Sequence, residues 1–233
     1  MAKVDLERRA QIGQEKRART RAQIIAAATT LFAHHAVASV TVDEVVAAAG
    51  VAKGTFYVHF ADLDALASAV ADELIATFDE LLQERRLGLA DPLTRIAFGC
   101  NSFFLKALDE PVWASLVARI SWSDAAVGRV ARLRLQEDLA RVLAEAHGAT
   151  LGVPAGLEVV LGIMVQSLMA FGSHRLTAND RLPIVDAILR TLGADKRRVR
   201  SALSHLPDIM PDASAEANAG APDSKARRTA RLG

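Results

Sequence analysis

The sequence predicts an all-α protein in which a small N-terminal helical domain is joined to a larger C-terminal helical domain. Apolar residues recur at the spacing of one helix face, for example at Ile24, Ala28 and Leu31, and this period marks an amphipathic helix. No stretch of the 233 residues shows the sustained alternation of a β-strand. A hydrophobic content of 51% beside 24% charged residues excludes a wholly disordered or collagen-like chain.

Three helices are predicted near the N-terminus, the first over residues 17–35. Thr41 begins the second helix, because its hydroxyl can accept from the Glu44 N–H while the Glu44 carboxylate returns to the Thr41 N–H, as in a capping box. Gly50 ends that helix, since glycine readily adopts the left-handed conformation that follows a helix. The third helix covers residues 52–60, where Phe56 and Phe60 share one face.

The rest of the chain is also predicted to be helical. Helices are expected at 62–86, 93–108, from Pro111 onward, and at 125–147, 154–173, 182–192 and 195–206. Gly88 and Asp91-Pro92 break the pattern between the first two of these helices. Arg134 and Asp138 stand four residues apart, so an ion pair along one helix is expected between them.

These elements divide the chain into four parts. We expect residues 1–16 to form a flexible N-terminal arm, 17–62 a three-helix domain, and 63–206 a larger helical domain. Residues 207–233 are expected to be disordered, because the last 23 residues contain a single large apolar side chain, Leu232.

The composition favours a soluble, cytoplasmic protein with no membrane partner. The single cysteine, Cys100, excludes an internal disulfide and a cysteine-rich zinc site, which suits a reducing compartment. The N-terminal residues lack the apolar core of a signal peptide. The apolar run Val159–Gly172 is shorter than the ~20 residues that span a bilayer.

Residues 41–60 have the pattern of a helix-turn-helix, in which a capped short helix and a glycine turn precede a second short helix. In this motif the second helix enters the major groove of DNA. The outward side chains suit that task, and they are Lys53, Gly54, Thr55, Tyr57 and His59. Residues 1–60 hold eight Lys and Arg against five Asp and Glu, which is compatible with nucleic acid and equally with a solvated helix.

The segment Gly50–Phe60, GVAKGTFYVHF, resembles the recognition segment of the TetR family of bacterial transcriptional regulators. The close resemblance covers about residues 17–66, and the remainder is similar only in its helical architecture. The resemblance implies a phosphate contact for Thr41, base contacts for Lys53, Gly54 and Thr55, backbone contacts for Tyr57 and His59, and phosphate or minor-groove contacts for Arg17, Arg19 and Arg21.

Two positions depart from the family pattern. Ala52 stands where the family often has Ser or Thr, so the recognition helix lacks a side-chain cap that is worth ~1 kcal/mol. Leu63, between Asp62 and Asp64, stands where the family often has a lysine that meets a phosphate. The second departure predicts weaker electrostatic anchoring on DNA.

The C-terminal domain is implied by the resemblance to bind a small-molecule effector. Aromatic residues concentrate in residues 98–122, which favours an apolar pocket, although a plain hydrophobic core has the same composition. The candidate pocket residues are Cys100, Phe103, Phe104, Trp113, Trp122 and Met164.

Two apolar stripes near the C-terminal end suggest a dimer interface. The candidate interface residues are Leu161, Val165, Leu168, Val185 and Leu189. Two helices from each of two chains would form a four-helix contact. An intramolecular core would produce the same stripes.

Together these features predict a homodimeric, ligand-responsive DNA-binding regulator, most simply a repressor that binds a near-palindromic operator and is released by an apolar effector. A transcriptional activator, and a helical small-molecule carrier or enzyme, remain the alternatives. No phosphate-binding glycine loop and no HExxH motif is present, so we expect no catalytic residue, no metal and no cofactor.

Overall fold

The computed structural model describes residues 2–123, 127–145 and 151–206. In these residues the fold is all-α, as the sequence predicts, without a β-strand. The elements are α1 (Ala2–His34), η1 (Val37–Ser39), α2 (Val42–Ala49), α3 (Lys53–His59), α4 (Leu63–Leu87), α5 (Pro92–Asp109), α6 (Pro111–Ser123), α7 (Arg129–Glu145), α8 (Val153–Gly172), η2 (Ala178–Asp180), α9 (Arg181–Thr191) and α10 (Lys196–Ser204).

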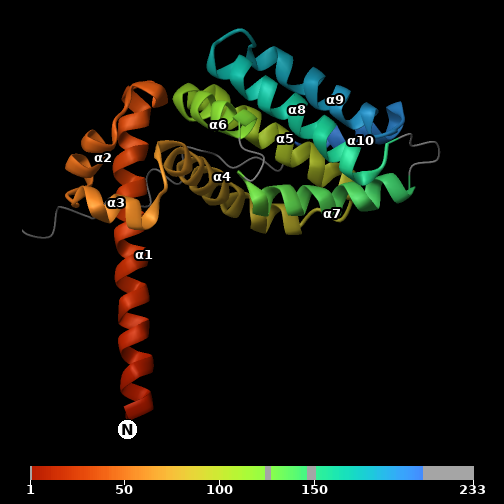
Figure 1. Ribbon diagram of the computed structural model, residues 1–233. Helices are drawn as coiled ribbons and strands as arrows, with labels where there is room; N and C mark the ends of the chain where they lie inside the picture. Colours follow the sequence, from red (N-terminus) through yellow and green to blue (C-terminus); the bar gives the residue numbers. More distant parts are fainter. Residues whose placement is uncertain (1, 124–126, 146–150, 207–233) are drawn as a thin grey trace, which may run out of the picture.

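In the N-terminal domain α2 packs against α1, and α3 packs against α2 (Figure 1). Ile24 and Phe32 of α1, Val45 of α2 and Phe56 of α3 are buried in its core. The predicted capping box forms at Thr41 and Glu44, and α2 ends at a left-handed glycine. The sequence signals for this domain are therefore confirmed.

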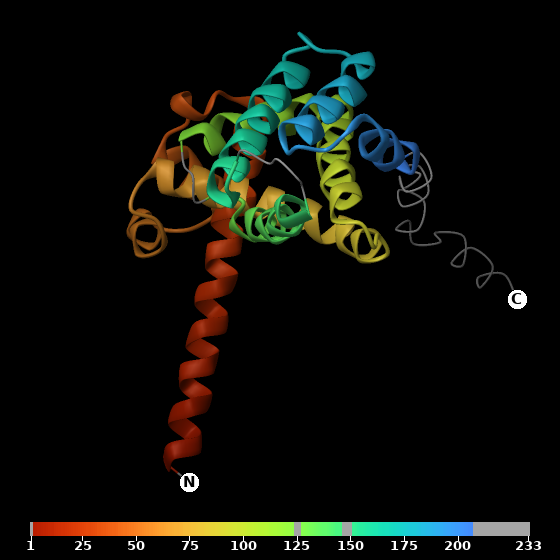
Figure 2. The ribbon, with the colours of Figure 1, turned by 90° about the vertical axis from the view of Figure 1, so that its right-hand side faces the viewer.

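Helix α1 is much longer than the sequence predicts. It begins at Ala2, so residues 2–16 are helical rather than the flexible arm that we expected. These residues contain no proline and are rich in Ala, Gln, Glu, Lys and Arg, which are good helix formers. Both views show this half of α1 projecting away from the rest of the molecule (Figures 1 and 2). The predicted tail, residues 207–233, lies outside the described residues.

Helix α4 joins the two domains. Asp62 caps it by accepting from the Ala65 N–H at 2.7 Å. Near its start, Leu66 and Val70 are buried where α4 contacts α1. Farther along, Ile75 and Leu82 are buried, and α4 there contacts α5, α6 and α7. One continuous helix therefore belongs to both cores.

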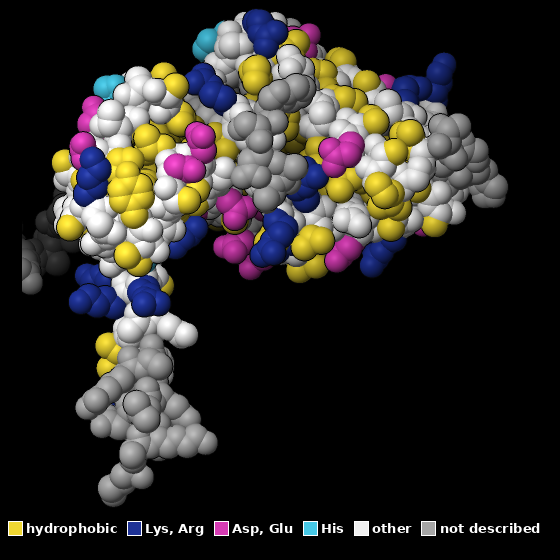
Figure 3. Space-filling view, viewed as in Figure 1, with side chains coloured by type: hydrophobic (Ala, Val, Ile, Leu, Met, Phe, Trp, Pro, Cys, Tyr) yellow, Lys and Arg dark blue, Asp and Glu magenta, His cyan; other side chains and the backbone are white. Residues whose placement is uncertain are grey.

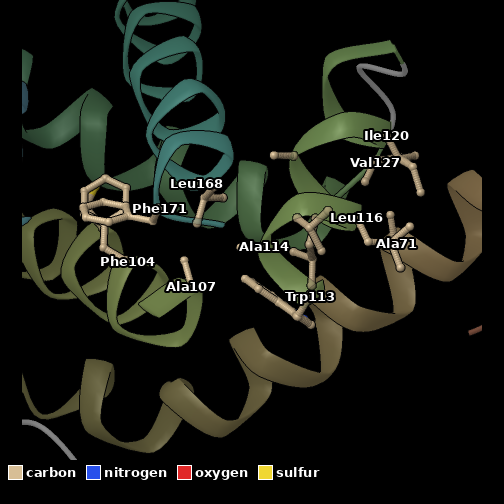
Figure 4. Close-up of a cluster of buried hydrophobic side chains, with 14 of the residues drawn as sticks. Ala71, Phe104, Ala107, Trp113, Ala114, Leu116, Ile120, Val127, Leu168 and Phe171 are labelled. Atoms are coloured by element: carbon tan, nitrogen blue, oxygen red, sulfur yellow. The ribbon is translucent and has the colours of Figure 1, made fainter. Parts of the chain in front are cut away.

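The C-terminal domain is a helical bundle around α5, which contacts each of α6 to α10. The buried cluster in Figure 4 brings Phe104 of α5 against Phe171 of α8, with ring centroids 5.3 Å apart. Helices α6 and α8 are in close contact beside Gly172, where an added Cβ would lie 2.6 Å from Ser115 Oγ. Glycine is needed there because the two helix backbones leave no room for a side chain.

Helix α8 is longer than the apolar run in the sequence suggested. Its 20 residues, Val153–Gly172, are long and apolar enough by composition to cross a membrane, so our length argument against a span was wrong. In the fold this helix contacts α5, α6, α7 and α9, and 39% of its most apolar window is buried. A core helix of a soluble protein passes the same test of length and hydropathy.

Candidate nucleic-acid interface and ligand cavity

The recognition helix α3 is held to the domain core by a buried side chain, and its opposite face is exposed to solvent. Phe56 is fully buried, and its ring meets Tyr57 edge to face with centroids 5.3 Å apart. Tyr57 and Val58 are 54% and 70% exposed, and Gly54 is exposed on the same face. Sequence reasoning missed Val58, although its place four residues after Gly54 puts it on that face. The structure exposes Lys53 as well, and half-buries Thr55 and His59.

Lys53 is paired with α2 in the free protein. Its Nζ lies 2.9 Å from Asp43 Oδ1 and donates to Asp43 Oδ2 at 3.1 Å. The hydrogen bond to Asp43 raises the pKa of Lys53 above its ordinary value, so the amine is charged at neutral pH. The lysine must leave Asp43, or share it, to reach a base edge.

Thr41 is occupied differently from what the resemblance implies. Its hydroxyl accepts from the Glu44 N–H at 3.3 Å and donates to Glu44 Oε2 at 2.8 Å. The hydroxyl and the backbone N–H of Thr41 both donate to the Glu44 carboxylate and lower the pKa of Glu44, which holds a negative charge beside the start of α2. In the free protein the single hydroxyl proton of Thr41 is therefore donated to Glu44, and the implied phosphate contact stays a prediction.

The basic part of α1 lies beside this surface. Arg17, Arg19 and Arg21 are exposed, and Lys and Arg side chains gather where α1 leaves the N-terminal domain (Figure 3). The guanidinium carbon of Arg21 lies 5.2 Å from the centroid of the Phe60 ring. Arg21 therefore contacts the domain's own core residue as well as solvent.

A cavity of about 340 Å³ lies between α4, α5, α6, α7 and α8. Cys100, Phe103 and Met164 line it, as expected of a pocket. Phe104 and Trp113 are outside its lining, contrary to expectation. Phe104 packs on Phe171 on another side of α5, and the Trp113 ring lies behind Phe103, 5.9 Å between centroids. The side chain of Trp122 lies outside the described part of the chain.

Charged residues that the sequence did not assign to the pocket line one part of the cavity. Asp138 accepts from Arg86 Nη2 at 2.6 Å and from Arg95 Nε at 2.7 Å. Asp79 accepts from Arg134, and Arg86 Nη1 lies 3.8 Å from it. The expected pairing of Arg134 with Asp138 along α7 is wrong, because both side chains find partners on other helices.

Comparison with known families decides the identity of the N-terminal domain. Residues 24–70 match the model of the tetR family of bacterial regulatory proteins. The N-terminal domain of this chain is therefore of the TetR type. This match spans the core of α1, the helix-turn-helix and the first third of α4. Comparison with curated proteins gives no match.

Solved structures share most of the fold of this chain. RolR in complex with resorcinol is 23% identical, with a TM-score of 0.66 over 84% of this chain and all of RolR. FadR from Bacillus subtilis in complex with stearoyl-CoA is 17% identical, with a TM-score of 0.57 over 74% of this chain and 97% of FadR. At such identities the likeness shows the fold.

The two departures from the TetR pattern have structural consequences here. Ala52 precedes α3 without a side-chain cap hydrogen bond, as expected. Leu63, at the position where the TetR pattern often has a lysine, is half-buried against the hydrophobic core. An apolar contact within the domain takes the place of a charge aimed outward.

The predicted dimer stripe faces inward. Leu168, Val185 and Leu189 are buried in the chain's own core, and Leu161 and Val165 line the cavity. The intramolecular alternative therefore describes Leu168, Val185 and Leu189, because these faces of α8 and α9 meet neighbouring helices of the same bundle. Leu161 and Val165 are only half-buried, and their role in a dimer stays a prediction.

The single cysteine of the chain, Cys100, is buried. Burial raises the pKa of the Cys100 thiol to about 12, so it is protonated and a poor nucleophile at neutral pH. Among the described residues no group of three or more His, Cys, Asp and Glu side chains is placed to hold a metal.

Proposed function

We propose that this TetR-family protein is a cytoplasmic repressor that binds a near-palindromic operator as a homodimer and releases it when a small molecule occupies the cavity. DNA would lie against α3 and the adjacent part of α1. The effector would lie between α4 and α8, in contact with a largely apolar wall.

The exposed face of α3 is the observation that carries this proposal. Lys53, Gly54, Tyr57 and Val58 point away from a core that holds α3 through the buried Phe56. A helix about 10–12 Å across fits a major groove about 12 Å wide. The exposed arginines of α1 supply positive charge for the adjoining phosphates.

Control by a small molecule is supported by the cavity and by the neighbours, since RolR is described with resorcinol and FadR with stearoyl-CoA. Helix α4 supplies Ile75 and Asp79 to the cavity wall and Leu66 to the contact with α1. A ligand that shifts α4 would change the separation of two recognition helices. Because half-sites lie ~34–36 Å apart, a small shift breaks simultaneous contact, and the coupling equals the difference in ligand affinity between the two states.

The dimer would form through the outer faces of α8 and α9. Helix α8 is strongly apolar although less than half of its most apolar window is buried, and Leu182 of α9 is 37% exposed. A second copy would cover this surface. Sedimentation should show a dimer that Leu182→Arg weakens and that Leu133→Arg, at a 54% exposed position on α7, leaves intact. A monomeric wild type would contradict this part of the proposal.

Operator binding can be measured by fluorescence anisotropy with duplex DNA from upstream of the protein's own gene. Lys53→Ala and Tyr57→Ala should each weaken binding by roughly tenfold or more, since both remove contacts in or beside the groove. Lys196→Ala, at an exposed position on α10, is the matched control and should bind like wild type.

Two results would overturn the proposal. Wild-type protein that fails to bind this DNA at moderate salt while it still binds a small molecule would favour the carrier. Effector and operator that bind the dimer independently would refute ligand control.

A further inference from the structure

The cavity has a polar end that the proposed function does not require. Asp79 and Asp138 line it and are only 5% and 4% exposed. Arg86 and Arg95, which also line it, hold Asp138 between α4 and α5. Arg95 Nη1 additionally donates to the Leu89 and Ala90 carbonyls at 2.8 and 3.0 Å, so its guanidinium is fixed in place.

These buried ion pairs contribute little net stability if folding is their only role. Burying charged groups costs solvation, and well-packed apolar residues of similar volume are often as stabilising as a buried ion pair. Charged side chains that share a cavity wall with apolar ones are typical of a ligand site. The remaining wall is apolar, and Phe103, Met164 and Leu168 form part of it.

The signs of the charges limit what fits. The wall holds three acidic residues, Asp79, Asp138 and Glu158, and three arginines, Arg86, Arg95 and Arg132. A ligand carboxylate would meet the buried aspartates, and a ligand ammonium would meet the arginines. A neutral hydroxyl satisfies both, because it donates to a carboxylate and accepts from a guanidinium.

We propose that the cavity binds a small, neutral, hydroxylated aromatic compound, with its hydroxyls at the Asp79–Asp138 end and its ring against Phe103. This inference rests on the proposed function and names the chemical class of its effector. The volume of about 340 Å³ accommodates a compact ring compound. Asp79 and Arg86 belong to α4, so a hydroxyl that enters their hydrogen-bond network acts on the helix that contacts the N-terminal domain.

The ligand class is tested by calorimetry on full-length wild-type protein with phenol, a dihydroxybenzene, toluene, benzoate and benzylamine at neutral pH. The hydroxylated rings should bind at least tenfold more tightly than the other three compounds. Equal binding of toluene, or tighter binding of benzoate or benzylamine, would overturn the proposal. Absence of phenol binding by a protein that still binds its upstream DNA would also overturn it, and would leave the DNA-binding function standing.

The site is tested with paired variants on the same helices. Asp79→Asn and Asp138→Asn should weaken binding of the dihydroxybenzene at least tenfold. Their exposed neighbours provide the controls Glu80→Gln and Glu137→Gln, which should stay within twofold of wild type. Unchanged binding in both aspartate variants would overturn the polar site.

A cavity-filling variant tests the ligand site without changing the buried aspartates, so its result does not depend on whether the aspartate variants fold. Gly99 lines the cavity, and a Cβ built there meets no atom within 4 Å. Gly99→Leu should therefore keep the thermal stability of the wild type and abolish binding of the dihydroxybenzene. Retained wild-type affinity in this variant would place the ligand elsewhere and overturn the assignment.

Discussion

The close contact of α6 with α8 at Gly172 predicts that Gly172→Ala destabilises the protein. A Cβ at this position would lie 2.6 Å from Ser115 Oγ, 2.9 Å from the Pro111 carbonyl oxygen and 3.1 Å from the Ser115 N. Two of these three atoms are backbone, so Gly172→Ala forces the helices apart rather than rotating a side chain. Overpacking of this kind costs about 1–3 kcal/mol, and the smaller entropy of the unfolded Ala chain returns about 0.4–1 kcal/mol.

The net effect is a loss of about 1–2 kcal/mol, which lowers Tm by about 2–8 °C for a chain of this size. Circular dichroism melting at matched protein concentration measures it, since association also shifts Tm. Gly99→Ala is the control, because a Cβ there meets no atom within 4 Å and the gain in helix propensity should raise Tm by up to about 4 °C. A Gly172→Ala protein that melts at or above the wild-type temperature, beside a normal control, would refute the close helix contact.

Four further results are expected. Burial raises the pKa of the Cys100 thiol to about 12, so Cys100 should react with a polar disulfide reagent at pH 8 only after the protein unfolds. Rapid stoichiometric labelling of the native protein would contradict the burial of Cys100. Asp195 caps α10, and the hydrogen bonds from backbone N–H groups lower its pKa. The stability it contributes is present above its unfolded pKa and lost as pH falls through its lower folded value, so the Tm advantage of wild type over Asp195→Asn should shrink on acidification from pH 5, and a constant difference would argue against this linkage. Ala52→Ser adds the missing cap of α3 and should stabilise the protein by ~1 kcal/mol, seen as a higher midpoint in urea. Asp43→Asn frees Lys53 and removes a negative charge near DNA, so operator affinity should rise several-fold in anisotropy titrations, whereas a decrease would show that Asp43 positions the lysine for binding.

The helix-turn-helix could be predicted because its signals are local. Thr41 and Glu44 are three residues apart, Gly50 acts through its own backbone angle, and Phe56 is the anchor within a single turn of α3. Interactions of this range are read directly from residue spacing. Val58 was missed although its spacing from Gly54 places it on the same exposed face, because an apolar side chain does not by itself suggest a contact with DNA.

The ligand cavity could be predicted only in part, because its polar end is assembled from distant segments. Asp79 and its partner Arg134 are 55 residues apart, and Asp138 and its partner Arg95 are 43 apart. Residue spacing favoured the local pair of Arg134 with Asp138, since four residues place two side chains on one face. Packing of α4, α5 and α7 supplied stronger partners across helices.

The chain's own pattern was sufficient for the all-helical class, the bounds of the two helices of the helix-turn-helix to within a residue, and the outward face of the recognition helix, since each depends on periodicity and on caps within a few residues. The direction in which each apolar stripe faces required the assembled bundle. Leu168, Val185 and Leu189 form faces that suit either a second copy or the chain's own core, because burial of apolar surface has no directional preference. Their helices meet α5 and α6 within one chain, and this arrangement turned an expected interface into a core and left the cavity with its charged wall beside it.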